Sequence, residues 1–205
     1  NYDEVLARSD LVLANCEPVA ESMARFAPEI HVIPNAADPP DGGPLPPRPA
    51  ALQGLTGPII GYVGNLSSRL DLDLLDELAS SHPSWQFVFA GSTHLGRDAL
   101  RLDRHPNVHF VGVLPHREAH DLLRHVDVAI VAHLDDEMTR AMNPLKVFVY
   151  ASAGAPIVST PIANLPDLGS QLLTARGADG FAAAIQVQLD RGRQPVDPER
   201  LAPHT

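Results

Sequence analysis

The chain has 205 residues, a hydrophobic content of 44% and a formal net charge of −10, so we expect one substantial folded core and neither a disordered nor a fibrous protein. The acidic balance offers no Lys and Arg cluster for a nucleic-acid backbone, and no apolar run reaches the roughly 18 residues of a membrane span. Cys16 is the only cysteine, which excludes an internal disulfide and a multi-cysteine zinc site and fits a reducing cytoplasm.

Residues 1–38 are predicted to form one βαβ unit. Apolar runs at residues 11–14 and 30–33 have the length of short buried strands, and a helical pattern lies between them. A single βαβ unit cannot cover both faces of a parallel sheet. We therefore expect these residues to pack against a domain that lies outside this sequence.

A proline-rich segment at residues 39–57 is predicted to be a linker. Its first part, residues 39–49, contains six prolines. Each proline fixes φ and removes an N–H donor, so this run cannot lie inside a helix or sheet. The linker divides residues 1–38 from a larger unit at residues 58–205.

The larger unit alternates between apolar runs and helical patterns. The runs are apolar throughout, as a parallel strand buried on both faces requires. One amphipathic helix is expected behind Asp71, and another ends at Gly154. The predicted fold class is therefore α/β, a doubly wound parallel sheet of the Rossmann-like type. Strands are expected at residues 58–63, 85–90, 108–113, 126–132 and 156–159, and helices near 72–79, 119–123, 144–153 and 180–189.

The first strand of the larger unit is followed by a glycine loop, residues 64–69. Ligands of such sheets bind beyond the carboxyl ends of the strands. Gly64 lets a ligand approach the backbone, loop amides can donate to phosphate oxygens, and Arg69 can pair with them. An ordinary strand-to-helix turn with Arg69 in solvent is the alternative that the spacing alone favours, and neither GxGxxG nor GxxxxGK[ST] is present.

A second candidate site is at residues 133–146. Pro144 suits the first position of a helix, which leaves Asn143 as the N-cap. Lys146 then lies in the first turn, where the helix dipole disfavours a cation unless an anion binds beside it. A Lys146 side chain extended into water is the alternative. His133 follows a strand and is either a sugar contact or a capping or partly buried histidine.

Three segments resemble a known family. They are Gly-Tyr-Val-Gly at residues 61–64, Asn-Val-His-Phe-Val-Gly at 107–112 and, above all, the segment from Asn-Pro-Leu-Lys to Pro-Ile-Val at 143–158. These residues resemble the donor domain of glycosyltransferase family 4, and residues 32–38 look like the segment leading into that domain. The resemblance covers nearly the whole chain. It implies the donor domain of a GT-B enzyme with residues 1–38 as a fragment of the acceptor domain.

The resemblance implies a nucleoside-diphosphate sugar as donor substrate and a retaining reaction. Arg69 and Lys146 are carried over as the catalytic cations that neutralise the departing diphosphate, a role metals play in other transferases, so no metal or other cofactor is expected. The rest of the acceptor domain is the expected partner, and peripheral membrane association of the full-length protein fits the family. The expected substrate contacts are Gly64, Asn65, Val113, Leu114, His133, Asn143 and Val149, with the backbone of Val113 and Leu114 near the base.

Val149 departs from the family pattern. The family usually has a glutamate there, which accepts hydrogen bonds from ribose hydroxyls. Loss of those bonds to an uncharged hydroxyl pair costs about 1–3 kcal/mol of donor affinity. The departure leaves open either weak donor binding or a non-catalytic protein.

Two other patterns suggest metal sites. His116 and His120 lie four residues apart on a predicted helix, yet the glutamate between them is one position away from the zinc-protease pattern. The acidic triplet at residues 135–137 suits a hard cation, but such loops are more often solvated. We expect neither to hold a metal.

The sequence thus predicts the donor-binding half of a cytoplasmic, retaining glycosyltransferase that moves a hexose to a glycan, lipid or small acceptor, and that is inactive as residues 1–205 alone. One alternative is a sugar-nucleotide epimerase, which needs acid and base carboxylates in the cleft. The other is a non-catalytic nucleotide-binding or scaffold module of the same fold.

Overall fold

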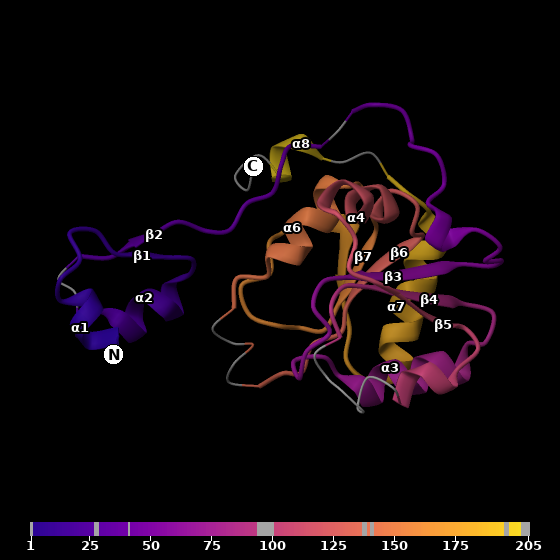
Figure 1. Ribbon diagram of the computed structural model, residues 1–205, viewed down its shortest axis with the longest axis horizontal. Coiled ribbons are helices and arrows are strands. Elements are labelled where there is room, and N and C mark those ends of the chain that lie inside the picture. The colour runs from indigo at the N-terminus through magenta and orange to yellow at the C-terminus, as the bar shows by residue number, and fades with distance from the viewer. Residues whose placement is uncertain are drawn as a thin grey trace.

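A six-stranded parallel sheet forms the centre of the larger unit (Figure 1). The computed structural model describes residues 2–26, 29–40, 42–93, 101–136, 139, 142–194 and 197–201. Neighbouring strands follow the order β5-β4-β3-β6-β7-β8, so the direction of winding reverses between β3 and β6. The predicted doubly wound α/β fold is confirmed. The strands are β3 (Ile59–Val63), β4 (Gln86–Ala90), β5 (Val108–Gly112), β6 (Val128–Val131), β7 (Ile157–Ser159) and β8 (Leu172–Thr174).

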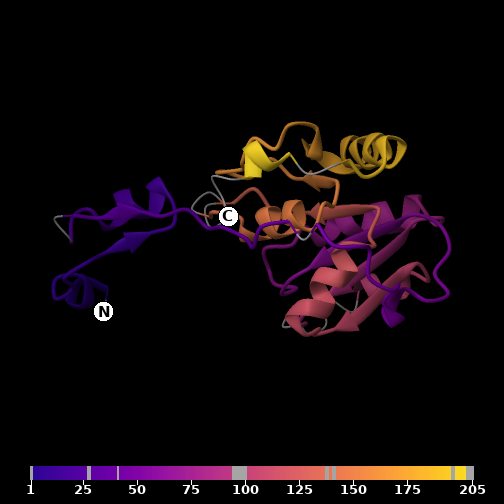
Figure 2. The ribbon, with the colours of Figure 1, turned by 90° about the horizontal axis from the view of Figure 1, so that it is seen from above.

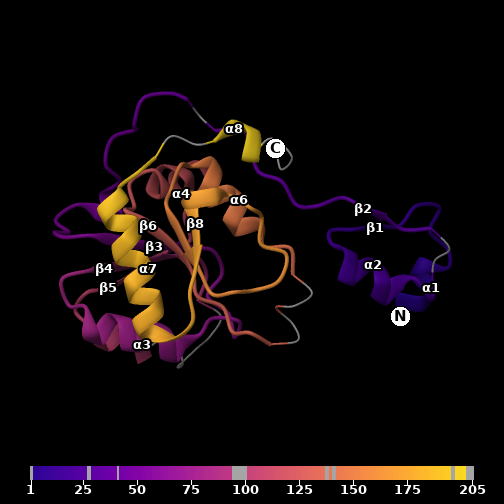
Figure 3. The same cartoon turned by 180° about the vertical axis from the view of Figure 1, so that it is seen from behind.

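Helices cover both faces of the sheet, and alternation along the strands decides which side chain meets which helix. Ile60 and Tyr62 pack with α3 (Leu72–Ser81) and α7 (Gly177–Arg191), whereas Ile59 packs with α4 (His116–Leu123) and α6 (Leu145–Ser152). Figure 3 shows α7 lying across the sheet from behind. Within the described ranges, no helix has the length and apolar character to cross a membrane.

Several local predictions hold, and others need correction. Asp71 caps α3 by accepting a hydrogen bond from the Leu74 amide at 3.0 Å, and Gly154, with φ +72°, follows the end of α6. Strand β8 was not predicted, because three half-exposed residues give too short an apolar run. Helix α7 also extends beyond the predicted residues 180–189, and the short helix α8 (Pro198–Leu201) follows it.

The predicted start of α6 is wrong by one residue. The helix begins at Leu145, and Pro144 takes the N-cap position in place of Asn143. Pro144 has φ −79° and ψ 81°, and the Leu145 amide donates to the Asn143 carbonyl at 2.9 Å. These values describe an inverse γ-turn centred on Pro144, which keeps the proline out of the helix.

Residues 2–26 and 29–33 form a small unit that lies apart from the six-stranded sheet (Figures 1 and 2). It consists of α1 (Tyr2–Leu6), β1 (Leu13–Ala14), α2 (Glu17–Met23) and β2 (His31–Val32), with β1 and β2 parallel. Leu11, Leu13 and Ile33 are 61%, 52% and 58% exposed. One apolar surface of this βαβ unit therefore faces solvent, and its assignment to an acceptor domain stays a prediction.

The predicted linker is attached to the large unit for much of its length. Arg124 donates to the Gly43 carbonyl at 2.8 Å, and His125 lies 2.8 Å from the Pro46 carbonyl oxygen. The short 3-10 helix η1 (Ala50–Leu52) places Leu52 fully inside the core. Residues 50–57 thus pack as part of the large unit, because burying leucine removes apolar surface from water.

Candidate functional site

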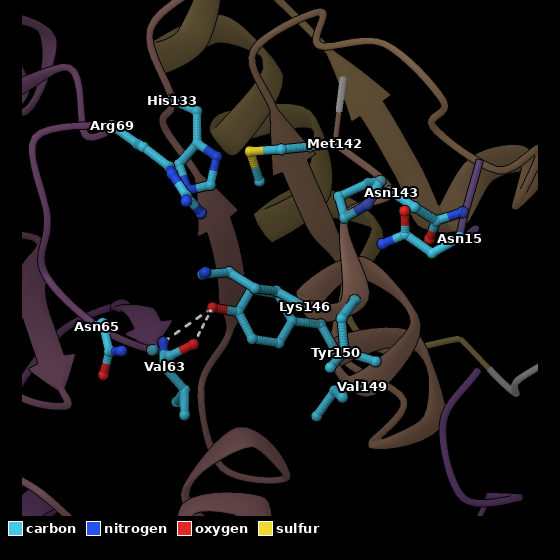
Figure 4. A pocket seen from close by; sticks show the side chains of 13 residues that line it. Asn15, Val63, Asn65, Arg69, His133, Met142, Asn143, Lys146, Val149 and Tyr150 are labelled. Atoms are coloured by element: carbon cyan, nitrogen blue, oxygen red, sulfur yellow. Dashed lines mark hydrogen bonds between the residues drawn. The ribbon is translucent and has the colours of Figure 1, made fainter. Parts of the chain in front are cut away.

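A cavity of about 510 Å³ opens at the carboxyl ends of β3 and β6, where the sheet reverses its winding. This is the position at which open α/β sheets bind ligands. Figure 4 shows side chains from both units around it. The lining residues are Asn15, Val63, Gly64, Asn65, Arg69, His133, Met142, Asn143, Pro144, Leu145, Lys146, Val149 and Tyr150.

Gly64 and Lys146 are in direct contact across this cavity. Gly64 follows β3 with φ +149°, and a Cβ atom built there would lie 2.7 Å from Lys146 Cε and 3.1 Å from Lys146 Nζ. The lysine side chain therefore passes over a bare Cα. Its ammonium lies 5.4 Å from the centre of the Tyr62 ring, a cation–π distance. A glycine at this position is required by both the backbone conformation and the close approach.

Lys146 is also the only lysine in the sequence, although arginine is frequent. Sequence reasoning did not use this signal. An ammonium is a compact charge on a flexible stem, whereas a guanidinium is planar and broader. The narrow passage over Gly64 gives a physical reason for lysine at this one position.

Arg69 supplies the second positive charge. It lines the main cavity together with Lys146, and both also line an adjoining hollow of about 290 Å³ beside Ser67 and Ser68. Burial, followed by the Arg69 charge, lowers the pKa of Lys146. None of the described residues in the main lining is Asp or Glu. Two cations in one cavity, in a chain of net charge −10, give this cavity the charge that suits an anionic ligand.

His133 lines the main cavity and the adjoining hollow together with these cations and is only 2% exposed. Its backbone is fixed by Thr160, whose Oγ1 donates to the His133 carbonyl at 2.8 Å and accepts from the His133 amide at 3.1 Å. Its Nδ1 atom has no hydrogen-bond partner among the described residues. Burial and then the Lys146 and Arg69 charges lower the pKa of His133 to about 4, with Asp136 opposing. The imidazole is therefore neutral at neutral pH, and it is both buried and directed at the cavity (Figure 4).

Asparagines bring further polar groups to the cavity. The Asn143 Oδ1 atom is buried without a partner in the described part of the chain, while the Asn143 carbonyl accepts from Asn35 Nδ2 at 2.9 Å. Asn15, which follows β1, lies beside Asn143 in Figure 4. Sequence reasoning missed Asn15 and Met142. The strand-end rule applied to residues 11–14 would have found Asn15.

Tyr150 links two elements that line the cavity, α6 and the end of β3. This tyrosine of α6 is 1% exposed, and its hydroxyl donates to the Val63 carbonyl at 2.8 Å and accepts from the Val63 amide at 2.9 Å (Figure 4). Burial raises the pKa of Tyr150 well above its ordinary value, so the hydroxyl keeps its proton. Sequence reasoning did not single out this residue.

The remaining predicted residues lie in different places. Asn65 and Val149 line the main cavity, and Val149 also lines a second cavity of about 370 Å³. Val113 is 73% exposed, and Leu114 lines a third cavity of about 290 Å³ beside Pro47. Neither is in the main lining, so their contact with a base stays a prediction.

The described residues of the two sequence patterns that suggested metal sites lie outside the lining of the main cavity. His116 and His120 of α4 line the second cavity with Asp38. Asp135 pairs with Arg176 at 3.2 Å, and Asp136 accepts from the Thr139 amide at 2.8 Å. Glu137 lies outside the described residues, and across the described ranges no three His, Cys, Asp or Glu side chains gather as a metal cluster.

The contact between Gly64 and Lys146 leads to a mutational prediction. Gly64→Ala should displace the Lys146 side chain and strain the backbone, lowering the free energy of unfolding by about 1–2 kcal/mol and weakening anion binding about tenfold. Urea unfolding and calorimetry measure the two effects. Gly180→Ala in α7, where an added Cβ has 3.9 Å of space, is the control and should leave the affinity unchanged. Unchanged affinity in Gly64→Ala would contradict the prediction.

The sequence of this chain is similar to those of known proteins. Residues 57–191 match the family described as "Glycosyl transferases group 1". TuaH of Bacillus subtilis strain 168, whose name places it in teichuronic acid biosynthesis as a glycosyltransferase, is 31% identical over 122 residues. The match covers 58% of this chain and 30% of TuaH, so the chain spans less than a third of that relative.

Two solved structures have a similar fold. The crystal structure of Anabaena Alr3699/HepE in complex with UDP and glucose matches with a TM-score of 0.67 and 16% identity, over 98% of this chain and 58% of that one. An α,α-trehalose-phosphate synthase (UDP-forming) from Burkholderia xenovorans, in complex with glucose-6-phosphate, matches with a TM-score of 0.63 and 18% identity, over 98% and 56%. At such identities the likeness establishes the shared fold.

Proposed function

This chain belongs to the glycosyl transferases group 1 family, and from that premise we propose that it is the donor-binding half of a retaining glycosyltransferase. The donor is a nucleoside-diphosphate sugar, and a hexose passes to a glycan, lipid or small acceptor. The observation that carries this proposal is the shared cavity whose lining brings together Gly64, Arg69 and Lys146. The binding of UDP by a structure of similar fold supports the same class of ligand.

In this proposal the diphosphate lies against Gly64, between Arg69 and Lys146. As the bond to the sugar breaks, negative charge grows on the diphosphate, and two fixed cations stabilise it more than they stabilise the intact donor. Lys146 is half-buried, which strengthens its share of this effect because charges interact more strongly away from water, whereas Arg69 is exposed. The cations would thus do the work for which other transferases use a metal ion.

The neutral groups are assigned to the sugar. His133 Nδ1 and Asn143 Oδ1 are buried polar atoms without partners among the described residues, and sugar hydroxyls can both donate and accept. Pairing with such hydroxyls would remove the free-energy cost of leaving buried polar atoms unsatisfied. This is our reason for placing the transferred hexose on the His133 side of the diphosphate.

The nucleoside is assigned to the opposite side, past Val149. Val149 and Leu145 line both the main cavity and the second cavity, and His116 and His120 line the second. Valine cannot accept hydrogen bonds from ribose hydroxyls, and imidazole nitrogens can. The second cavity therefore offers hydrogen-bond acceptors for the ribose in place of the glutamate that the family usually has at position 149.

The acceptor is assigned to a part of the enzyme outside this sequence. The solved structures of similar fold are longer, and this chain spans 58% of one and 56% of the other. The exposed Leu11, Leu13 and Ile33 of the small unit are apolar surface available for packing against such a domain. On this proposal residues 1–205 bind the donor but do not transfer the sugar.

Thermal-shift titration with UDP, GDP and ADP tests the proposal. One of the three should raise the melting temperature by about 5–10 °C at a concentration 100 times its dissociation constant, because ligand binding stabilises the folded state. A chelator should not change the shift if the cations replace a metal. No shift with any of the three nucleotides would contradict donor binding.

A non-catalytic nucleotide-binding module is the second candidate, and Val149 is the observation that favours it. Such a module would give the same thermal shift, so only the full-length protein separates the two. Nucleotide binding without sugar transfer would establish the module. The epimerase alternative gains no support, since no described residue in the cavity lining is Asp or Glu.

A further inference from the structure

Tyr150 connects the two parts of the site that carry the diphosphate contacts. It lies one helical turn after Lys146 on α6, and its hydroxyl bonds both polar backbone atoms of Val63, the residue before Gly64. One phenol thus joins the helix that carries the ammonium to the strand end that carries the glycine. Figure 4 shows the two hydrogen bonds beside the Lys146 side chain.

The two hydrogen bonds of the Tyr150 hydroxyl take the place of β3–β6 pairing at Val63. Pairing of β3 with β6 is recorded at Ile60 and Gly61 and stops before Val63. The Val63 amide and carbonyl would otherwise be unpaired at the half-buried end of the strand, which is energetically costly. A tyrosine hydroxyl can satisfy both, because it donates one hydrogen bond and accepts others.

The fit between Lys146 and Gly64 leaves little freedom for α6 to move. The lysine Cε lies 2.7 Å from the place a Cβ on Gly64 would occupy. A shift of α6 by a fraction of an ångström changes that contact and the position of the ammonium. The contacts of α6 through Val147 and Ala151 side chains are apolar and non-directional. Its hydrogen bonds at Ser152 and at the Ala151 carbonyl lead to Asp38 and Gln171, not to β3. The paired hydrogen bonds of Tyr150 are directional and fix the register.

We propose that Tyr150 is a positioning residue that holds Lys146 over Gly64 through its two hydrogen bonds to Val63. Its hydroxyl is engaged with Val63, and the inference rests on the proposed function only for the identity of the anion. Loss of the hydroxyl should displace the ammonium and admit water around it. Affinity for a diphosphate then falls even while the protein remains folded.

Because Lys146 is the only lysine, its titration can be followed separately. Reductive methylation with ¹³C-formaldehyde labels this side chain and the N-terminal amine only, and NMR then gives the pKa of Lys146. In Tyr150→Phe the pKa of Lys146 should rise toward the ordinary value of lysine, since less burial favours the charged form. Calorimetry with UDP, GDP and ADP should show about tenfold weaker binding of whichever nucleotide the parent protein binds.

A matched control separates positioning from lost stability. Asn107→Ala removes three hydrogen bonds, to the carbonyls of Ala79, His82 and Trp85, outside the lining of the main cavity. It should lower the melting temperature and leave both the Lys146 titration and the affinity unchanged. If Tyr150→Phe does not fold, 4-fluorophenylalanine in place of Tyr150 removes the donor while keeping the volume.

The outcomes are distinct. A Tyr150→Phe protein that is less stable but keeps the parent pKa of Lys146 and the parent affinity would make Tyr150 purely structural and overturn the inference. If the parent binds none of the three nucleotides, the proposed function fails, but the Lys146 titration still decides the role of Tyr150. A shifted titration in Tyr150→Phe together with an unshifted one in Asn107→Ala supports it.

Discussion

Lys146→Met should weaken nucleoside-diphosphate binding about 100-fold, equivalent to about 2.7 kcal/mol. The side chain supplies one of two charges in a cavity without a lining carboxylate among its described residues, and removing one partner of a desolvated charge pair costs several kcal/mol. The stability of the unliganded protein should, by contrast, increase. Burial and Arg69 already lower the pKa of Lys146, so replacing the ammonium with an apolar group of similar length should stabilise the unliganded fold by about 1 kcal/mol.

Calorimetry at constant ionic strength measures the affinity, and urea unfolding measures the stability. Arg101→Met is the charge-matched control, because Arg101 is half-exposed, pairs with Asp73 at 3.1 Å and is absent from the cavity lining. This control should change the affinity less than twofold. Equal loss of affinity in both variants would show that the net charge of the chain, and not the site, attracts the nucleotide.

Acidification should destabilise the protein through His133. Its pKa in the folded protein is about 4, below the ordinary value of 6.5, so the unfolded chain binds the proton more readily. The contribution of His133 to stability is complete above about pH 6.5 and is lost progressively as the pH falls to about 4. The difference corresponds to about 3 kcal/mol of unfolding free energy.

Urea unfolding at several pH values between 7 and 4 would measure this loss. In His133→Gln the acid destabilisation should be smaller by about 3 kcal/mol, since no buried imidazole has to accept a proton. His116→Gln, which removes a histidine of α4 outside the main cavity, should keep the full pH dependence of the parent protein. Parallel pH curves for His133→Gln and the parent protein would show that His133 is not the responsible group.

The sequence predicted most of the sheet, because its strands are apolar on both faces and leave an unambiguous pattern. It also predicted the ends of helices where one residue type controls the outcome, as at Asp71 and Gly154. The prediction was wrong where residues distant in the sequence determine the backbone conformation. At Pro144 the γ-turn is set by the Asn143 carbonyl, which also accepts from Asn35, a residue of another segment.

Within the site, the sequence alone determined that Gly64, Arg69 and Lys146 are candidates, since strand ends and a misplaced cation can be recognised locally. Only the tertiary structure decided that these residues share one cavity, that the ammonium passes over Gly64, and that Tyr150 and Asn15 belong to the walls. The reason is physical: a sequence pattern reports the periodicity of one element. Distances between elements depend on packing and hydrogen bonds that residues far apart in the chain form together.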